Sequence, residues 1–169
     1  MRKVLVMGSP GAGKSTFARR LGDALGLPVI HLDKVFWNAG WVETPRPAFR
    51  EKVQALVDGP AWVMDGEFNG ACIEARVAAA DKIIYLDTPR LLCMWRILWR
   101  SFRTYGQVRA DMAPGCPEQF SWDFFKYAWN HRRDHRPRTL ALISAAPEKL
   151  VILSGSPAAE RYLHEARRT

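Results

Sequence analysis

One segment of the chain has the residue types and the spacing needed to bind the phosphates of a nucleotide. Residues 8–15 read Gly-Ser-Pro-Gly-Ala-Gly-Lys-Ser and match the pattern G-x-x-x-x-G-K-[ST] at every fixed position. Glycines such as Gly8 and Gly11 let backbone N–H groups converge on one anion, and the following helix adds positive charge at its N-terminus. Lys14 is expected to reach the β- and γ-phosphates and Ser15 to bind Mg²⁺. The alternative, glycines that serve only a turn, is disfavoured by the complete pattern.

Three acidic residues, Asp33, Asp65 and Asp87, stand at the ends of apolar runs that read as strands. Ligands of open α/β sheets bind beyond the carboxyl ends of the strands, so these carboxylates are candidates for the same site. We interpret Asp65 as a group that holds Mg²⁺, directly or through water, in preference to a turn residue of its Asp-Gly pair. Asp87 precedes Thr-Pro and is interpreted as a residue at the entry of a helix.

Asp33 bears on the type of phosphoryl acceptor. A hydroxyl acceptor must lose a proton, which a nearby carboxylate can take, whereas a phosphate acceptor is already ionised. Asp33 therefore favours a hydroxyl acceptor; the alternative is that it orders Mg²⁺-bound waters or caps a turn. The aromatic residues Phe36, Trp37 and Trp41 follow in an irregular stretch. They could stack on a base or cover a sugar, although core packing is the more common role of such side chains.

Two segments, 89–105 and 122–136, combine aromatic residues with arginines at helical spacing. The arginines recur every three or four residues: Arg96, Arg100 and Arg103 in the first segment, and Arg132, Arg133 and Arg136 in the second. We expect the tryptophans between them to lie in the core. Two arginine faces would repel one another unless an anion lies between them, and nucleotide phosphates would supply it. His131 and His135 have the i, i+4 spacing of metal ligands, but the neighbouring arginines disfavour a cation there.

These residues need a scaffold, and the chain alternates strands with helices. Apolar runs rich in β-branched residues predict five strands, at Val4 to Met7, Val29 to Leu32, Trp62 to Met64, Lys82 to Leu86 and Leu150 to Leu153. Helical patterns lie at Lys14 to Leu25, Pro47 to Val57, Cys72 to Ala79, Pro89 to Tyr105, Trp122 to Arg136 and Pro157 to Arg167. The alternation predicts an α/β fold with a parallel sheet covered by helices on both faces. The irregular stretch Gly106 to Gln119 is the candidate for a mobile lid.

Composition limits the class of protein. The chain has 169 residues, which suits one domain, with a lid-like region at about 103–135. Its 25 Lys and Arg against 17 Asp and Glu give a net charge of +8, compatible with nucleic acid, a membrane surface or a small anionic substrate. Arginines clustered beside a phosphate-binding loop favour phosphate clamping, with a solvated basic face as the alternative for any one of them. Without a leader or a spanning segment, we expect a cytoplasmic protein with no membrane partner, whose three cysteines are reduced.

The motifs together resemble the adenylate-kinase-like nucleoside and nucleotide kinases over nearly the whole chain. The stretches His31 to Asp33, Asp65-Gly66, Pro89 to Arg96 and Asp111 to Glu118 are similar in particular to the bacterial branch called topology-modulation proteins. The resemblance implies a P-loop fold with the strand order 2-3-1-4-5, ATP bound under a closing lid, and an acceptor site between the second and third strands.

The resemblance also implies roles for individual residues. Phosphate would be bound by Gly11, Ala12, Gly13, Lys14, Ser15 and Thr16. Asp65 would order Mg²⁺, Arg100 would lie near the adenine or the phosphates, and Arg132 and Arg136 would clamp the transferred group. Adenylate kinases carry Ser or Thr in place of Asp33, and Phe-Pro-Arg where this chain reads Glu67-Phe-Asn69. The arginine that would hold an acceptor phosphate is thus missing, and Arg76 is a candidate replacement.

The sequence therefore predicts a Mg²⁺- and ATP-dependent kinase of a nucleoside, nucleotide or similar small metabolite. Its acceptor and its oligomeric state are left open. The alternative is a nucleotide-switched protein that binds nucleic acid, as the name of the branch implies, with weak or no kinase activity. No helix-turn-helix or zinc-finger pattern supports that alternative in the sequence.

Overall fold

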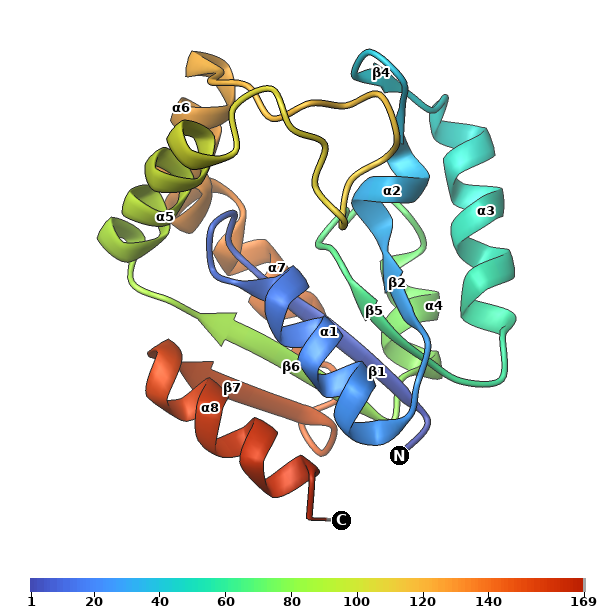
Figure 1. The fold of residues 1–169 in the computed structure, drawn as a ribbon. Coiled ribbons are helices and arrows are strands. Elements are labelled where there is room, and N and C mark those ends of the chain that lie inside the picture. The colour runs from blue at the N-terminus through green and yellow to red at the C-terminus, as the bar shows by residue number, and fades with distance from the viewer. Residues whose placement is uncertain (169) are drawn as a thin grey trace.

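The centre of the molecule is a parallel sheet of five strands, seen in the computed structural model, which describes residues 1–168 (Figure 1). Its strands run in the order β2-β5-β1-β6-β7. Their bounds are Lys3–Gly8 (β1), Val29–His31 (β2), Trp62–Asp65 (β5), Lys82–Asp87 (β6) and Leu150–Ser154 (β7). Counted within this sheet alone, the order is 2-3-1-4-5. The α/β fold and the five predicted strands are confirmed.

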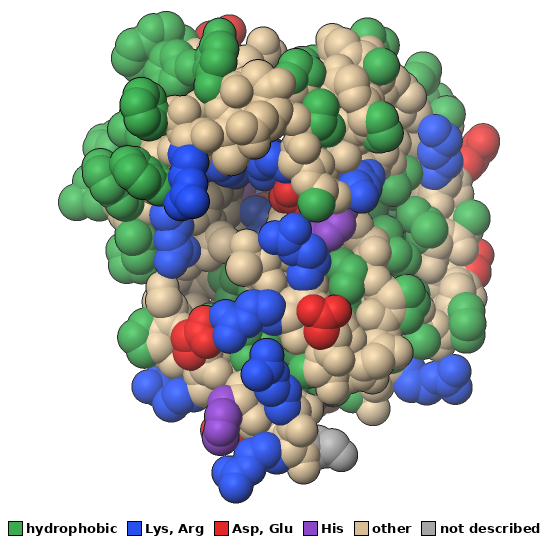
Figure 2. All heavy atoms as spheres, in the orientation of Figure 1, with side chains coloured by type: hydrophobic (Ala, Val, Ile, Leu, Met, Phe, Trp, Pro, Cys, Tyr) green, Lys and Arg blue, Asp and Glu red, His purple; other side chains and the backbone are tan. Residues whose placement is uncertain are grey.

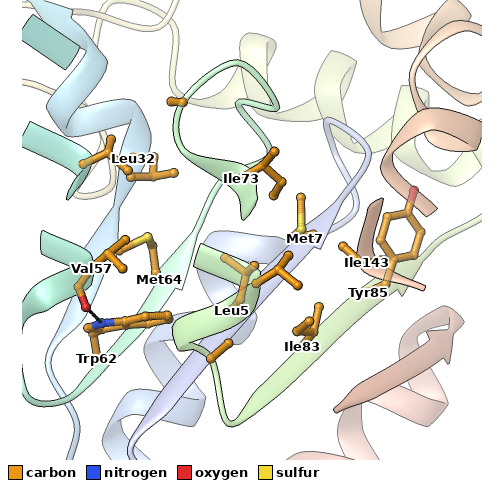
Figure 3. Close-up of a cluster of buried hydrophobic side chains, with 14 of the residues drawn as sticks. Leu5, Met7, Leu32, Val57, Trp62, Met64, Ile73, Ile83, Tyr85 and Ile143 are labelled. Atoms are coloured by element: carbon orange, nitrogen blue, oxygen red, sulfur yellow. Dashed lines mark hydrogen bonds between the residues drawn. The ribbon is translucent and has the colours of Figure 1, made fainter. Parts of the chain in front are cut away.

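Helices cover both faces of the sheet, as the alternation predicted. The helices α1 (Lys14–Leu25) and α8 (Gly155–Ala166) lie on one face, where Val4 and Val6 of β1 point. On the other face Leu5 and Met7 meet α3 (Arg46–Asp58), α4 (Ile73–Ala79) and α7 (Arg136–Ile143). The buried side chains of this second layer are drawn in Figure 3. Adjacent residues of β1 thus feed two separate cores because side chains of a strand alternate between its faces.

The sequence analysis did not predict the short helix and hairpin that follow β2. The chain forms the helix α2 (Leu32–Phe36) and then a hairpin of two short strands, β3 (Trp37–Asn38) and β4 (Val42–Glu43). Gly40 and Trp41 form its turn with positive φ values of 75° and 62°. Strands of two residues carry too little periodicity to be recognised in a sequence. Phe36 packs against Phe49 and Phe68, so this aromatic residue belongs to the core and not to an open surface.

The region between β6 and β7 holds α5 (Arg90–Arg103), α6 (Trp122–Asp134) and α7, with a loop of residues 104–121 between the first two. We call residues 104–121 the crossing loop because they pass over the carboxyl ends of the strands toward the hairpin (Figure 1). One helix had been predicted from Trp122 to Arg136, but the structure breaks it at His135. Pro137 has no N–H to continue the hydrogen bonds of α6, so α6 ends at Asp134 and α7 begins at Arg136.

The aromatic stripe of α5 is exposed, and its predicted burial was wrong. Trp95 is 61% exposed, Trp99 51% and Phe102 82%, whereas Cys93 and Ile97 are buried. Figure 2 shows the apolar surface over α5 and α6. Apolar residues surround most of this helix, so periodicity alone did not identify its inner side. Among the helices described for residues 1–168, none has the length and apolar character needed to span a membrane.

Candidate active site

The turn between β1 and α1 has the shape of a phosphate cradle. Gly8 and Gly11 have φ values of 141° and 76°, which L-residues with side chains rarely adopt. A Cβ on Gly8 would lie 2.6 Å from the Leu86 carbonyl oxygen, and one on Gly11 would lie 2.5 Å from that of Cys93. Lys14 folds over the loop and donates from Nζ to the Ser9 carbonyl oxygen at 3.0 Å. The glycines are thus required by both backbone conformation and close packing.

Neighbouring elements hold this loop in place. The carbonyl oxygen of Ala12 accepts hydrogen bonds from Thr88 Oγ1 and from Arg96 Nη1, each at 3.2 Å. Arg96 also donates from Nη2 to Ser156 Oγ at 2.8 Å, which links the loop to the start of α8. Gly13 lies below this arginine, and Thr16 is exposed on α1. Arg96 is therefore a support of the loop.

Asp65 is the last residue of β5, and one of its two carboxylate oxygens has a hydrogen-bond partner while the other has none among the described residues. Asp65 Oδ1 and His31 Nδ1 are 2.8 Å apart, and both residues are buried. Asp65 Oδ2 is buried without a hydrogen-bond partner among the described residues. A buried carboxylate oxygen of this kind fits a magnesium ligand. No three His, Cys, Asp or Glu side chains of residues 1–168 form a metal site by themselves.

Asp33 lies in the first turn of α2, beside the phosphate-binding loop. Burial raises the pKa of its carboxyl group, and the nearby charges of Asp65 and Asp111 act in the same direction. The positive charges of Lys14 and Arg109 oppose them and lower that pKa. Lys14, Asp33 and Asp65 are therefore near enough for their charges to act on one another, and their roles in a reaction stay a prediction. A carboxyl group with a raised pKa binds a proton more strongly and suits a general base.

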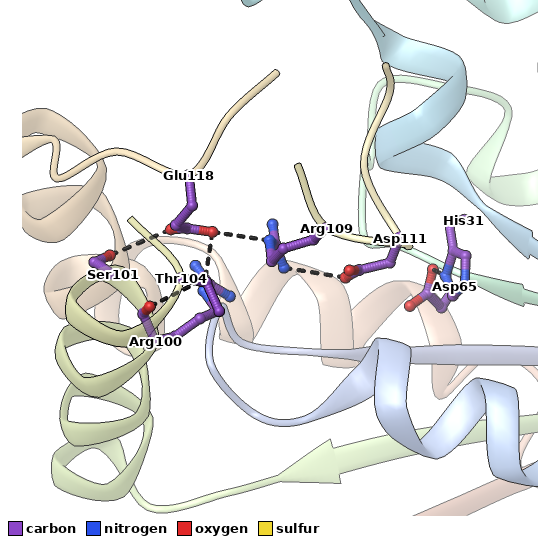
Figure 4. A network of polar contacts seen from close by, with 8 residues as sticks. All are labelled: His31, Asp65, Arg100, Ser101, Thr104, Arg109, Asp111 and Glu118. Atoms are coloured by element: carbon purple, nitrogen blue, oxygen red, sulfur yellow. Dashed lines mark hydrogen bonds and ion pairs between the residues drawn. The ribbon is translucent and has the colours of Figure 1, made fainter. Parts of the chain in front are cut away.

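The crossing loop inserts charged side chains into this site (Figure 4). Asp111 pairs with Arg109 at 3.1 Å, and although burial would raise the pKa of Asp111, Arg109 and the nearby Ser15 hydroxyl hold it below its usual range. Glu118 pairs with Arg109 at 2.8 Å and with Arg100 at 3.3 Å. Arg100 of α5 and Arg109 of the crossing loop are thus paired with carboxylates of the protein. The sequence analysis instead expected nucleotide phosphates to lie between the arginines. Ser15, predicted to bind Mg²⁺, lies near this loop.

The crossing loop also contacts the hairpin on its far side. Gly40 donates its N–H to the Gly115 carbonyl oxygen at 2.8 Å, and Trp41 donates from Nε1 to that of Pro117 at 3.1 Å. Gly115 has a φ of 77°, and a Cβ there would lie 2.7 Å from the Cβ of Ala39. The loop therefore spans the site from α5 to the hairpin. Figure 2 shows a hollow beneath it, with Lys and Arg side chains gathered around the opening.

Arg132 and Arg136 converge on Asp87 at the end of β6. Arg136 makes two hydrogen bonds to its carboxylate, at 3.2 and 2.7 Å, and Arg132 Nη1 lies 3.9 Å from Oδ1. The interpretation of Asp87 as a helix-entry residue was wrong, because α5 begins after Pro89 without a side-chain cap. The carboxylate instead orients two guanidinium groups toward the strand ends.

Glu67, just after β5, joins α6 and α7 to the sheet. Its Oε2 lies 2.8 Å from His131 Nε2, and its Oε1 accepts a short hydrogen bond from the Thr139 hydroxyl. Burial alone would raise the pKa of Glu67, but the contacts with His131 and Thr139 outweigh burial and lower it. His131 is thus committed to an acid, while His135 is exposed and stacks on its ring.

Arg76 does not replace the missing acceptor-binding arginine. Its side chain is 0% exposed and donates to the carbonyl oxygens of Gly66, Glu67 and Phe68 at 3.0, 2.9 and 2.7 Å. Burial lowers its pKa to about 10. Arg76 therefore fixes the conformation of the loop after β5 through these three hydrogen bonds.

Several site residues were not singled out by the sequence reasoning: His31, Arg109, Asp111, Glu118 and the pairing role of Asp87. His31 was within reach, because it ends a strand at the edge where ligands bind. The crossing-loop residues gave no periodic signal. The one available signal was that Asp111 and Glu118 are acidic residues within an arginine-rich region, which favours ion pairs inside the protein.

Comparison with known proteins agrees with this geometry. No family model matches the chain. An adenylate kinase of Clavibacter michiganensis subsp. michiganensis (strain NCPPB 382) is 33% identical over 110 residues, which make up 63% of this chain and 53% of that protein. The chain thus spans about half the length of this relative.

Two solved structures share the fold. A shikimate kinase from Acinetobacter baumannii in complex with shikimate is 18% identical, with a TM-score of 0.59 over 98% of this chain and 90% of that chain. A shikimate kinase from Bacteroides thetaiotaomicron is 13% identical, with a TM-score of 0.55 over 99% of this chain and 97% of that chain. The α/β fold of this chain is therefore the one that these two shikimate kinase structures have. Its sequence likeness is to an adenylate kinase.

Proposed function

We propose that the protein is a phosphotransferase that moves the γ-phosphoryl group of Mg²⁺-bound ATP to a hydroxyl group of a small molecule. The observation that carries this proposal is the position of Asp33, a carboxylate with a raised pKa beside Lys14 and Asp65. A base is needed there only if the acceptor is a hydroxyl. The likeness to adenylate kinase and to shikimate kinases supports the kinase reaction but leaves the acceptor open.

The nucleotide would be held by the loop of residues 8–15. Its backbone N–H groups and Lys14 would bind the phosphates, while the Ser15 hydroxyl and Asp65 would hold Mg²⁺. The ion would neutralise charge on the β- and γ-phosphates. Arg100 would lie along the phosphates after exchanging its contact with Glu118. Arg132, 45% exposed and loosely paired, is the arginine most free to reach the transferred group, with Arg136 fixed behind it by Asp87.

The residues would divide the reaction between them. The acceptor hydroxyl gives its proton to a carboxylate oxygen of Asp33, and its oxygen forms a bond to the γ-phosphorus. The bond from the γ-phosphorus to the β-γ bridging oxygen breaks, and ADP leaves with that electron pair. The crossing loop would act as the lid of a single domain, within a lid-like region of about residues 103–135, and exclude water from the transfer.

The proposal is tested by ADP release from ATP and Mg²⁺ in the presence of a panel of acceptors. Lys14→Ala should abolish turnover and leave the fold intact, because Lys14 contacts only the loop it serves. Asp33→Asn should lower transfer to a hydroxyl acceptor by about 10²–10⁴ with little change in ATP affinity. Asp23→Asn, on the exposed side of α1, is the matched control and should behave as the parent.

Two results would contradict the proposal. Full turnover by a folded Lys14→Ala variant would remove the assignment of the phosphate cradle. Efficient phosphorylation of nucleoside monophosphates, none of hydroxyl compounds, and an unimpaired Asp33→Asn variant would return the protein to the nucleotide kinases.

A further inference from the structure

A group of polar side chains lies beyond the ends of β2 and β5, on the acceptor side of Asp33. Asn69 Nδ2 and Thr139 Oγ1 are 2.8 Å apart, and the Thr139 hydroxyl donates to Glu67. The Tyr127 ring packs edge-on against His131, the partner of Glu67, with 5.7 Å between the ring centroids, and burial with the charges of Glu67 and Asp33 raises the pKa of Tyr127 to about 12. We call Asp33, Glu67, Asn69, Tyr127 and Thr139 the acceptor-side cluster.

Lys14, whose charge acts on both Asp33 and Glu67, donates to the Ser9 carbonyl oxygen and is assigned to the phosphates of ATP. Arg76 is fully buried on three carbonyl oxygens, and the remaining arginines are paired with carboxylates or with the phosphate-binding loop. These are Arg96, Arg100, Arg109, Arg132 and Arg136. Lys34 follows Asp33 on α2 but is exposed and projects about 100° away from it around the helix. The proposed function assigns Arg100 and Arg132 to the phosphates of ATP. Releasing Arg109 or Arg136 as well, for an acceptor anion, would take the remaining partner from Glu118 or Asp87, which costs much of what is gained.

The polar groups of the cluster for which no partner is described are hydrogen-bond acceptors. Asn69 Oδ1 is buried without a partner among the described residues, and Asp33 presents a carboxylate. Glu67 has its two oxygens committed to His131 and Thr139, but it still contributes negative charge. A ligand that donates hydrogen bonds, through hydroxyl or amino groups, satisfies such a surface. A carboxylate or phosphate offers only acceptors and would face the charges of Asp33 and Glu67.

We propose that the phosphoryl acceptor is a polyhydroxy compound that carries no carboxylate or phosphate group. This inference rests on the proposed kinase function and adds the charge of the substrate to it. It separates this chain from kinases whose acceptor is an anion, because the arginines named above are held by carboxylates or carbonyl oxygens of the protein. An amino group on the acceptor is compatible with the same surface.

The test uses matched sets of acceptors that share their hydroxyl groups and differ in charge. One set is glucose, glucosamine and glucuronate, a second is adenosine and AMP, and a third is shikimate and its methyl ester. ADP release is measured with saturating ATP and Mg²⁺. In any set that is turned over, the anionic member should have a kcat/KM about 10–100-fold below its neutral partner, as expected for a like charge within several ångströms in a partly buried site. The ratio should shrink at high salt.

Variants separate charge from shape. Glu67→Gln should reduce the preference for the neutral member severalfold, because one of the two negative charges is removed. Lys34→Gln removes an exposed positive charge on the same helix as Asp33 and should leave the preference and the turnover unchanged.

Three outcomes would overturn the proposal. The first is an anionic member that is the better acceptor in its set, AMP and shikimate included. The second is a preference that does not change with salt or with Glu67→Gln. The third is an absence of transfer to every neutral and amino member while ATP and Mg²⁺ bind normally. Loss of ATP binding itself would instead contradict the proposed kinase function, so the two failures are distinguishable.

Discussion

Replacement of Arg76 by methionine tests whether the loop after β5 is built on this buried side chain. The guanidinium is 0% exposed and donates to three consecutive carbonyl oxygens, those of Gly66, Glu67 and Phe68. Methionine is similar in length and fills most of the space, but it donates no hydrogen bond. Arg76→Met therefore removes the donors and leaves the packing nearly unchanged.

The size of the effect follows from the three carbonyl groups. An unsatisfied buried polar group costs roughly 1–3 kcal/mol, which gives an upper limit of about 9 kcal/mol for three. Glu67 and Phe68 keep some exposure, so water recovers part of this cost. We expect a loss of about 3–5 kcal/mol in the free energy of unfolding. Domains of this kind are stable by only about 5–15 kcal/mol, so the variant should be severely weakened.

Urea unfolding of the full chain measures the loss. With an m-value of about 2 kcal/mol/M, the midpoint should fall by about 1.5–2.5 M. Arg76→Lys should recover less than half of the loss, because one ammonium group does not match the reach of the guanidinium fork. Arg138→Met, at an exposed position of α7, is the control and should leave the midpoint in place. An unchanged midpoint for Arg76→Met, with a raised KM for the acceptor, would refute the structural role and make Arg76 a substrate contact.

Further predictions follow from the crossing loop and from Asp33. Because burial raises the pKa of Asp33, the contribution of Asp33 to the free energy of unfolding should fall as pH rises from about 3.9 through that raised value. Asp33→Asn should abolish this fall and be more stable than the parent at pH 7 but not at pH 3; equal stability at pH 7 would be inconsistent with a desolvated carboxylate. Gly115→Ala should loosen the contact with the hairpin and raise the KM for the acceptor. Gly106→Ala has a similar φ of 74° and open space around it, so it should do so less; equal effects would mean that only backbone strain matters. Glu118→Gln removes the charge of one of the two acidic partners of Arg109 and should speed tryptic cleavage of the crossing loop by about tenfold, the effect of roughly 1.4 kcal/mol on local opening, a result that an undocked loop would not give.

The sequence was sufficient for the parts of the fold that depend on short-range patterns. The glycines and Lys14 predicted the phosphate-binding loop, because few residue types other than glycine let a backbone approach an anion closely. Asp33 and Asp65 were found because strands of a parallel sheet end at one edge. Each inference used a rule in which a few neighbouring residues determine the outcome.

The rest depended on contacts between distant segments. Arg76 and Asp87 were misinterpreted because their partners lie in other elements, and nothing local says whether an arginine faces a ligand, an acid or a carbonyl oxygen. The stripe of α5 was assigned to the core for a related reason. Apolar spacing identifies an amphipathic helix, but here both its inner and outer sides are apolar, and only packing against Ala128 distinguishes them.

The crossing loop has a consequence for the order in which molecules enter and leave. Its Asp111 lies near Ser15 of the phosphate-binding loop, and its Gly115 accepts a hydrogen bond from Gly40 of the hairpin. In the proposed reaction this one segment would cover both the nucleotide and the acceptor. Both products would then leave after a single opening event, in either sequence. Steady-state kinetics with two varied substrates should show a ternary complex, random release, and a turnover rate that follows solvent viscosity if opening is the slow step.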